Sequence, residues 1–145
     1  MKIYLAGPLF TSAERSWNQR LATLLKELGH EVFLPQAEEP REHTARAIFE
    51  LDRNAIDSAD VIVGIMDGPD PDAGTCWECG YAYGKKPIVL LRTDFRAGAK
   101  PGLGPYNPML AESADVHIEQ PLASVEETAR AIHTALLSIR PRAAP

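Results

Sequence analysis

Short apolar runs alternate with helix-like segments along the whole chain, and this alternation limits the possible folds more than any other feature. A run at residues 61–66 is almost continuously apolar, as expected of a parallel strand that is covered on both faces. Other strand-length runs occupy residues 3–6, 31–34, 87–91 and 116–118. Strands that alternate with helices predict βαβ units. We therefore expect an α/β fold: a single domain with a five-stranded parallel sheet flanked by helices, of the Rossmann or flavodoxin-like kind.

Three capping-box patterns mark expected helix starts. Thr11-Ser-Ala-Glu14 precedes the first apolar stripe, Thr75-Cys-Trp-Glu78 a short helix, and Ser124-Val-Glu-Glu127 the last helix. A further helix is expected from the low 40s to Ser58. The Gly- and Pro-rich segment 92–107 is predicted to be a loop.

Length and composition fit one domain. The chain has 145 residues and a formal net charge of -5. We expect residues 1–140 to form the domain and residues 141–145 a short tail. The basic residues are scattered, so no nucleic-acid partner is expected, and no apolar run approaches the roughly 20 residues that span a bilayer. The first residues do not resemble a signal peptide, so the expected location is cytoplasmic.

The loops after the strands are the expected place for a ligand. In parallel sheets, ligands bind beyond the carboxyl ends of the strands. The predicted segments at that edge are residues 7–11, 35–39, 67–74 and 92–107. Gly7-Pro8 matches neither glycine-rich phosphate motif, so no nucleotide cofactor is expected.

Asp52 interrupts an apolar helix face. Ile48, Asp52, Ala55 and Ile56 have the spacing of one face. An unpaired charged carboxylate is costly in apolar surroundings, so Asp52 should be paired, protonated or functional. A carboxylate at the edge of the face that reaches water or Arg53 is the alternative.

Carboxylates also cluster in the segment 67–78, which contains Asp67, Asp70, Asp72 and Glu78. Asp and Pro are common turn residues, so the segment could be purely structural. Paired carboxylates are also the groups that glycosyl chemistry uses: one attacks the anomeric carbon and a second acid/base assists the leaving group. The spacing lacks the EF-hand pattern, and no metal is expected.

Cys76 and Cys79 form a C-x-x-C pair. A redox pair at a helix start is one interpretation. Zinc would need further ligands at short spacing, and the four histidines are isolated in the sequence. Packing of a short helix is the favoured interpretation.

From Lys2 to about Asp115, the chain resembles the nucleoside 2-deoxyribosyltransferase family. The segment Ile3-Tyr-Leu-Ala-Gly-Pro-Leu-Phe10 is similar to the first strand and loop of that family. Asp72-Ala-Gly-Thr-Cys-Trp-Glu-Cys-Gly80 resembles its D-x-G-[ST]-x-x-E-x-G signature, and Asn107-Pro-Met109 resembles its N-x-M segment. Asp52 matches the position of the acid/base aspartate.

The resemblance implies that domain 1–140 is catalytic, with Glu78 as nucleophile, Asp52 as acid/base and Tyr4 as support for the nucleophile. It assigns no chemistry to the cysteines and no cofactor. In the family, the N-x-M segment enters the active site of a neighbouring subunit, which implies a homo-oligomer, a dimer or a multiple of dimers. The implied substrate-binding residues are Asp72, Phe10, Gly7, Asn107, Met109 and Gln36.

The resemblance implies transfer of 2-deoxyribosyl between nucleobases, with small nucleosides and nucleobases as partners. The alternatives are an N-glycoside hydrolase of nucleosides or 5′-monophosphates, a nucleotide-binding module without turnover, and a redox protein. Two segments depart from the family: the end of the chain lacks an aromatic residue, and the loop 92–106 contains Asp94-Phe-Arg96.

Overall fold

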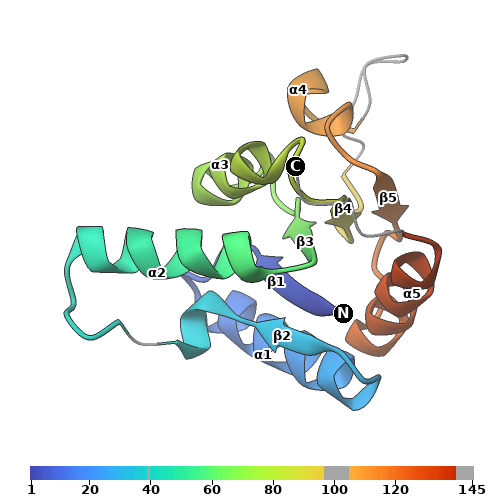
Figure 1. Cartoon of the computed structure of the whole chain (residues 1–145). Coiled ribbons are helices and arrows are strands. Elements are labelled where there is room, and N and C mark those ends of the chain that lie inside the picture. Colours follow the sequence, from blue (N-terminus) through green and yellow to red (C-terminus); the bar gives the residue numbers. More distant parts are fainter. Residues whose placement is uncertain (39, 97–104, 140–145) are drawn as a thin grey trace.

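The computed structural model describes residues 1–38, 40–96 and 105–139, and it confirms the five-stranded parallel sheet (Figure 1). All four strand pairs are parallel and the strand order is β2-β1-β3-β4-β5. The predicted tail 141–145 and much of the loop 92–106 lie outside the described residues. The strands are β1 (Lys2–Ala6), β2 (Glu31–Phe33), β3 (Val61–Ile65), β4 (Ile88–Arg92) and β5 (Val116–Glu119).

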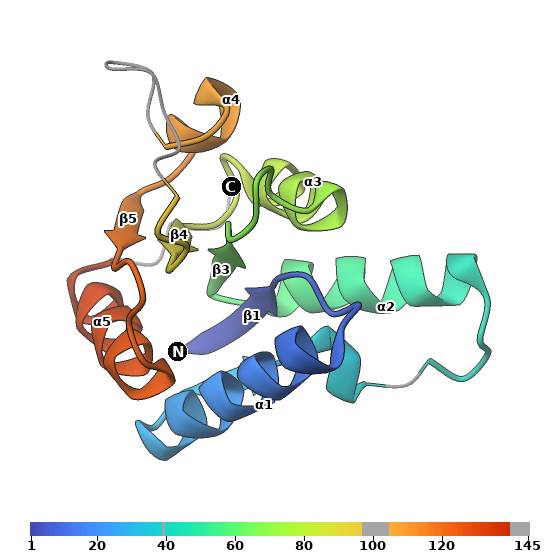
Figure 2. The ribbon, with the colours of Figure 1, turned by 180° about the vertical axis from the view of Figure 1, so that it is seen from behind.

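Helices cover both faces of the sheet (Figures 1 and 2). Helices α1 and α5 lie on one face, and α2 and α3 lie on the other with α4 beside α3. None of the helices in the described ranges is long and apolar enough to cross a membrane. The helices are α1 (Ser12–Glu27), α2 (Ala45–Ser58), α3 (Ala73–Ala82), α4 (Pro108–Ala111) and α5 (Val125–Ser138), with a 3₁₀ turn η1 (Pro35–Ala37).

The side chains of β1 alternate between two cores. Ile3 and Leu5 join the core beneath α1 and α5, whereas Tyr4 and Ala6 join the core beneath α2 and α3. This follows from the two-residue period of a strand. Tyr4 is completely buried, so β1 places a phenol hydroxyl in the α2–α3 layer.

Gly64 brings α3 close to the sheet. A Cβ atom at Gly64 would lie 2.8 Å from the Cys79 Sγ atom and 2.9 Å from the Met66 Cε atom. Contacts this short leave no room for a methyl group. Cys79 is fully buried in this contact, in agreement with the packing interpretation of the cysteines.

Two of the three predicted capping boxes are confirmed. In α1 the Glu14 N–H donates to Thr11 Oγ1 at 3.2 Å and the Thr11 N–H donates to Glu14 Oε2 at 2.7 Å. The same reciprocal bonds join Ser124 and Glu127 at the start of α5. Such boxes satisfy N–H groups that have no partner within the helix.

A histidine pair joins the end of α1 to α5 and should make folding stability depend on pH. His30 Nε2 lies 2.9 Å from His133 Nδ1, within hydrogen-bond distance. Partial burial, above all, lowers the pKa of His30 below its usual value, and His133 adds to this effect. As pH falls below about 6.5 the unfolded chain binds more protons than the folded chain, so folding becomes less favourable.

We expect the urea midpoint of unfolding to decrease when the pH is lowered from 7.5 to 5.5, and to decrease more in the wild type than in His30→Gln. These two pH values lie about one unit either side of the pKa of a free imidazole. The comparison with His30→Gln removes the background from other titrating groups. An equal fall in both proteins would contradict a role for the pair.

Candidate active site

Tyr4 and Glu78 meet beneath α3, although they are far apart in the sequence. The Tyr4 hydroxyl donates a hydrogen bond of 2.5 Å to Glu78 Oε1. The Tyr4 ring stacks on Phe33 with a centroid distance of 5.4 Å, which fixes the direction of the hydroxyl. Burial and the neighbouring Glu78 charge raise the pKa of Tyr4. Tyr4 therefore remains a neutral donor to the carboxylate.

Glu78 is held in surroundings that oppose its ionisation. The pKa of Glu78 is raised to about 7, chiefly by burial, and the charges of Asp52 and Asp72 add to the shift. The hydrogen bond from Tyr4 acts in the opposite direction because it stabilises the anion. The result is a half-buried carboxyl that ionises near neutral pH, and its ionised form can act as a nucleophile.

Asp52 lies on the neighbouring helix α2. Its side chain is half-buried, and burial alone raises its pKa to about 6. Its charge raises the pKa of both Glu78 and Tyr4, and α2 contacts α3 over the face of the sheet that contains Tyr4. The expected alternative partner, Arg53, donates instead to Asn54 Oδ1 at 2.9 Å. A carboxyl with a pKa raised in this way can carry a proton closer to neutral pH, which is a property that a general acid needs.

Asp72, and not Thr75, caps α3, so the third predicted capping box is wrong. Asp72 Oδ2 accepts hydrogen bonds from the Thr75 N–H at 2.9 Å and the Thr75 hydroxyl at 3.1 Å. The helix consequently begins at Ala73, two residues earlier than predicted. Glu78 lies in the second turn, beyond the part of the helix where its dipole acts strongly. The stabilisation of the Glu78 anion therefore comes mainly from Tyr4.

Asp67 and Arg92 hold the loop that leads to α3, and sequence analysis did not assign them this role. Asp67 accepts hydrogen bonds from the Thr93 and Asp94 N–H groups and from the Thr93 hydroxyl. Arg92 ends β4 and is buried, and its guanidinium donates to the carbonyls of Met66 and Gly68. An arginine at the end of an apolar run is visible in the sequence, but its burial and its partners are not.

The first loop and η1 contain three further residues that the family resemblance assigns to substrate binding. Gly7 lies against Ile65, where a Cβ atom would approach Ile65 Cδ1 to 2.9 Å. Phe10 is 74% exposed. Gln36 is tied to α1: its Nε2 donates to the Arg15 carbonyl at 2.7 Å and its Oε1 accepts from Asn18 at 3.2 Å. Base binding by Gln36 would have to compete with these bonds or use its remaining N–H.

Asn107 and Met109 lie on the side of α3 opposite to Glu78. They line a cavity of about 770 Å³ together with Cys76 and Gly80. Cys76 is two positions before Glu78, or about 200° around the helix. Asn107 Oδ1 caps α4 by accepting from the Met109 N–H at 2.9 Å, and Met109 is 83% exposed. The structure therefore does not bring this pair to the carboxylates of the same chain.

The cysteines have the properties of packing residues. Burial raises the pKa of the Cys79 thiol to about 12, and burial also raises that of Cys76. The Cys76 thiol contacts the Pro71 carbonyl at 3.8 Å. A raised pKa disfavours the thiolate that redox exchange needs.

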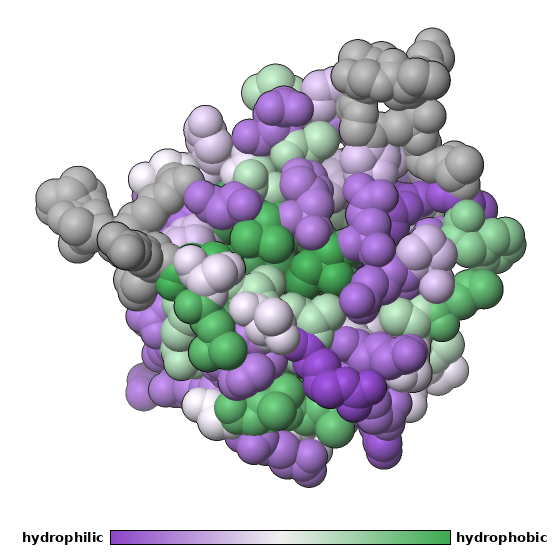
Figure 3. Space-filling view, turned by 90° about the vertical axis from the view of Figure 1, so that its right-hand side faces the viewer, coloured by the Kyte–Doolittle hydropathy of each residue, from purple (hydrophilic) through white to green (hydrophobic). Residues whose placement is uncertain are grey.

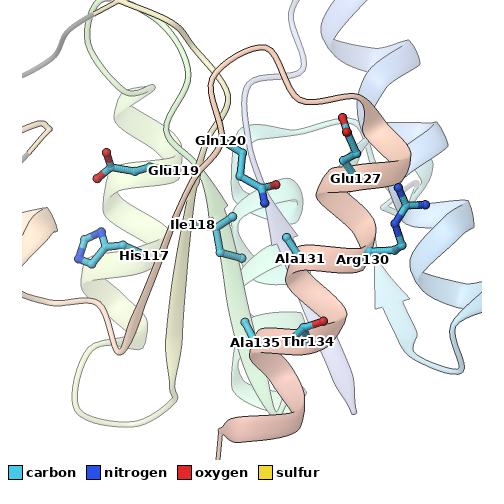
Figure 4. A pocket seen from close by; sticks show the side chains of 9 residues that line it. All are labelled: His117, Ile118, Glu119, Gln120, Glu127, Arg130, Ala131, Thr134 and Ala135. Carbon is cyan, nitrogen blue, oxygen red and sulfur yellow. The ribbon is translucent and has the colours of Figure 1, made fainter.

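Other features of the surface do not involve Asp52 or Glu78. A groove of about 650 Å³ between β5 and α5 contains none of the site residues predicted from the sequence (Figure 4). The face seen from the right of Figure 1 shows scattered hydrophobic patches among hydrophilic residues (Figure 3). Within the described ranges, no three His, Cys, Asp or Glu side chains are grouped so that they could hold a metal ion.

A flavodoxin-like sheet that carries two electrostatically coupled carboxyls of raised pKa, one of them hydrogen-bonded to a buried tyrosine, is compatible with an enzyme that cleaves glycosidic bonds. Residues 3–119 match the family model for nucleoside 2-deoxyribosyltransferase. The chain belongs to this family, whose members act on nucleosides and nucleobases. It is accordingly an N-glycosyl transferase or hydrolase.

Solved structures share this fold. A 2-deoxyribosyltransferase from Bacillus psychrosaccharolyticus has a TM-score of 0.69 and 28% identity, over 99% of this chain and 100% of that one. A CMP N-glycosidase from Clostridium botulinum has a TM-score of 0.66 and 22% identity, over 93% and 99% of the two chains. A 2-desoxiribosyltransferase from Leishmania mexicana has a TM-score of 0.65 and 24% identity, over 89% and 95%. No curated protein matches significantly in sequence.

Proposed function

We propose that the protein transfers 2-deoxyribosyl between nucleobases through a covalent ester on Glu78. The observation that carries this proposal is the contact of Glu78 with Tyr4 and its electrostatic coupling to Asp52. The roles of nucleophile and acid/base are taken from the family resemblance, and the raised pKa values support them.

In the first step, Glu78 attacks C1′ of a 2′-deoxynucleoside while Asp52 gives a proton to the departing base. The C1′–N bond breaks and its electron pair leaves with the base. In the second step, a nitrogen of a new base attacks C1′, Asp52 takes up the proton of that nitrogen, and Glu78 leaves. Two inversions retain the configuration. The reaction as proposed needs no metal or organic cofactor.

Substrate placement follows from the residues around the two carboxyls. Asp72 retains a second carboxylate oxygen that accepts no hydrogen bond from the described residues, and we assign it to a sugar hydroxyl. Gly7 and Phe10 are assigned to the base pocket, with a weaker contribution from Gln36. Asn107 and Met109 are assigned to the active site of a second subunit, because they lie away from Glu78 of their own chain.

The charges near the site favour an unphosphorylated nucleoside. The N–H groups of Phe10 and Thr11 at the start of α1 already bind the Glu14 carboxylate. A helix start of this kind would otherwise suit a phosphate. Arg92 is bonded to backbone carbonyls, and Arg96 pairs with Asp94. Asp72 would also repel a dianion.

Base exchange tests the proposal directly. We expect the protein, given 2′-deoxyinosine and free adenine without phosphate, to produce 2′-deoxyadenosine, measured by liquid chromatography. Hypoxanthine without 2′-deoxyadenosine would establish a hydrolase. If 2′-deoxyinosine does not react, the same assay is repeated with pyrimidine deoxynucleosides, ribonucleosides and 5′-monophosphates as donors. Activity on 5′-monophosphates alone would contradict the inference that the site favours an unphosphorylated nucleoside. Tight binding without turnover of any donor would indicate a nucleotide-binding module without catalysis.

Light scattering on the same sample tests the assignment of Asn107 and Met109 to the active site of a second subunit, because a fully active monomer would refute it.

A further inference from the structure

Asp52 and Glu78 belong to different helices, so their separation depends on what fixes α2 against α3. The two helices lie side by side over the same face of the sheet (Figures 1 and 2). None of the backbone–backbone hydrogen bonds among the described residues joins α2 to α3. Side chains must therefore set the distance and the relative rotation of the two helices.

A hydrogen-bonded contact lies on the C-terminal side of both carboxyls. The Tyr81 hydroxyl is 3.0 Å from Asp57 Oδ1 and 3.1 Å from Asp57 Oδ2. Lys86 Nζ donates to the Asp57 carbonyl at 2.8 Å. Asp57 is about 7.5 Å along α2 from Asp52, and Tyr81 about 4.5 Å along α3 from Glu78, at 1.5 Å per residue.

An aromatic contact lies on the N-terminal side. Phe49 meets Trp77 with a centroid distance of 5.4 Å. Phe49 precedes Asp52 by one turn of α2, and Trp77 directly precedes Glu78. Trp77 also stacks on Tyr81 at 5.2 Å with an interplanar angle of 10°, so the aromatic and the hydrogen-bonded contacts form one unit. Together they bracket the two carboxyls.

Burial alone does not explain this unit. Phe49 is 39% exposed and Trp77 is 48% exposed, so they contribute less to the core than buried residues of their size. The Tyr81–Asp57 bond is exposed, and an exposed bond of this kind adds little to folding stability. The unit connects the helices at the level of the site, where small displacements strongly affect catalysis.

We propose that the Asp57–Tyr81 hydrogen bond is a latch that positions Asp52 against Glu78, with Asp57 and Tyr81 as positioning residues. This inference rests on the proposed function for its kinetic test. The raised pKa of Glu78 supports it, because burial between the helices and the nearby Asp52 both depend on their spacing. Asp57 and Tyr81 themselves take no part in bond making.

Tyr81→Phe tests the latch, because it retains the stacked ring and removes only the hydroxyl. We expect kcat for base exchange to fall about 10- to 100-fold while KM changes less than about threefold. Asp57→Ala should lower kcat in the same way, because it leaves no side-chain oxygen to accept the bond from the Tyr81 hydroxyl. The double variant should be no worse than the more damaging single variant, since both remove one interaction.

A second measurement does not depend on turnover. Carbon-13 NMR of the side-chain carboxyls should show the pKa of Glu78 lower in Tyr81→Phe than in the wild type, because water reaches it once the helices loosen. Tyr83→Phe is the matched control: Tyr83 is 59% exposed, and the same hydroxyl is lost two residues further on. It should match the wild type in both measurements.

Wild-type kcat and a wild-type Glu78 titration in Tyr81→Phe would overturn the latch. A fall in kcat that only follows the fraction of unfolded protein, measured by circular dichroism, would also overturn it. If the wild type neither exchanges nor hydrolyses any nucleoside, the proposed function fails. In that case the Glu78 titrations in the wild type, Tyr81→Phe and Tyr83→Phe are the only test of the latch.

Discussion

Glu78→Ala is expected to lower the rate of base exchange by at least about 10,000-fold, because the variant has no atom that can bond to C1′. The residual reaction would have to proceed by direct attack of the incoming base, without the covalent intermediate. The measurement is the initial rate of 2′-deoxyadenosine formation from 2′-deoxyinosine and adenine. Substrate binding should persist, since the sugar and base contacts assigned to Asp72 and Phe10 remain.

Glu78→Gln is the matched control for packing. Its amide oxygen can still accept the hydrogen bond from the Tyr4 hydroxyl, which is 2.5 Å from Glu78 Oε1 in the wild type. We expect this variant to fold normally and to be as inactive as Glu78→Ala. Mass spectrometry of acid-quenched wild type with donor should show a deoxyribosyl adduct on the peptide that contains Glu78. Full exchange activity in either variant would refute the covalent mechanism.

The fold could be predicted because its signals are local. The apolar run 61–66 and the capping boxes at Thr11 and Ser124 depend on neighbouring residues, and the structure confirms them. The first residue of α3 could not be predicted from neighbouring residues alone. Asp72 and Thr75 are both good capping residues, and the choice depends on Asp72 binding both donors of Thr75.

The site was predictable as a set of residues but not as an arrangement. The family motifs singled out Tyr4, Asp52 and Glu78; the structure joins Tyr4 to Glu78 by a hydrogen bond, and the charge of Asp52 acts on both. The roles of Asp67 and Arg92 depend on contacts between the ends of β3 and β4, which no local pattern specifies. For the same reason, the sequence did not indicate that Asp57 and Tyr81 join the helices.

The pH dependence of the reaction follows from the two carboxyls. Their pKa values of about 6 for Asp52 and about 7 for Glu78 mean that the pair holds one proton near neutral pH. Because Glu78 has the higher pKa, most of this proton is on Glu78, and the reactive form, with the proton on Asp52 and the charge on Glu78, is the minor one-proton form. Below about 6 the pair takes up a second proton and Glu78 cannot attack; above about 7 it loses its last proton and no acid remains. The profile of kcat/KM should therefore be bell-shaped.

Asp52→Asn should change both the rate and the shape of this profile. We expect kcat/KM for 2′-deoxyinosine to fall about 100- to 10,000-fold, because the base must leave without a proton from Asp52. The alkaline limb should disappear with the acid. The limb that remains should report Glu78 alone and lie below about 7, because the Asp52 charge raises the pKa of Glu78 and its removal lets that pKa fall.

Comparison of leaving groups separates acid catalysis from a general loss of structure. A donor whose base leaves readily without protonation should lose much less activity in Asp52→Asn than 2′-deoxyinosine does, because the barrier that Asp52 lowers is smaller for it. Asp60→Asn, the same chemical change on an exposed residue just beyond α2, should leave the rate and the profile unchanged. An alkaline limb that persists in Asp52→Asn would assign the acid to another group. A loss equal for all donors would make Asp52 a binding residue, and Glu78 would then expel the base without help.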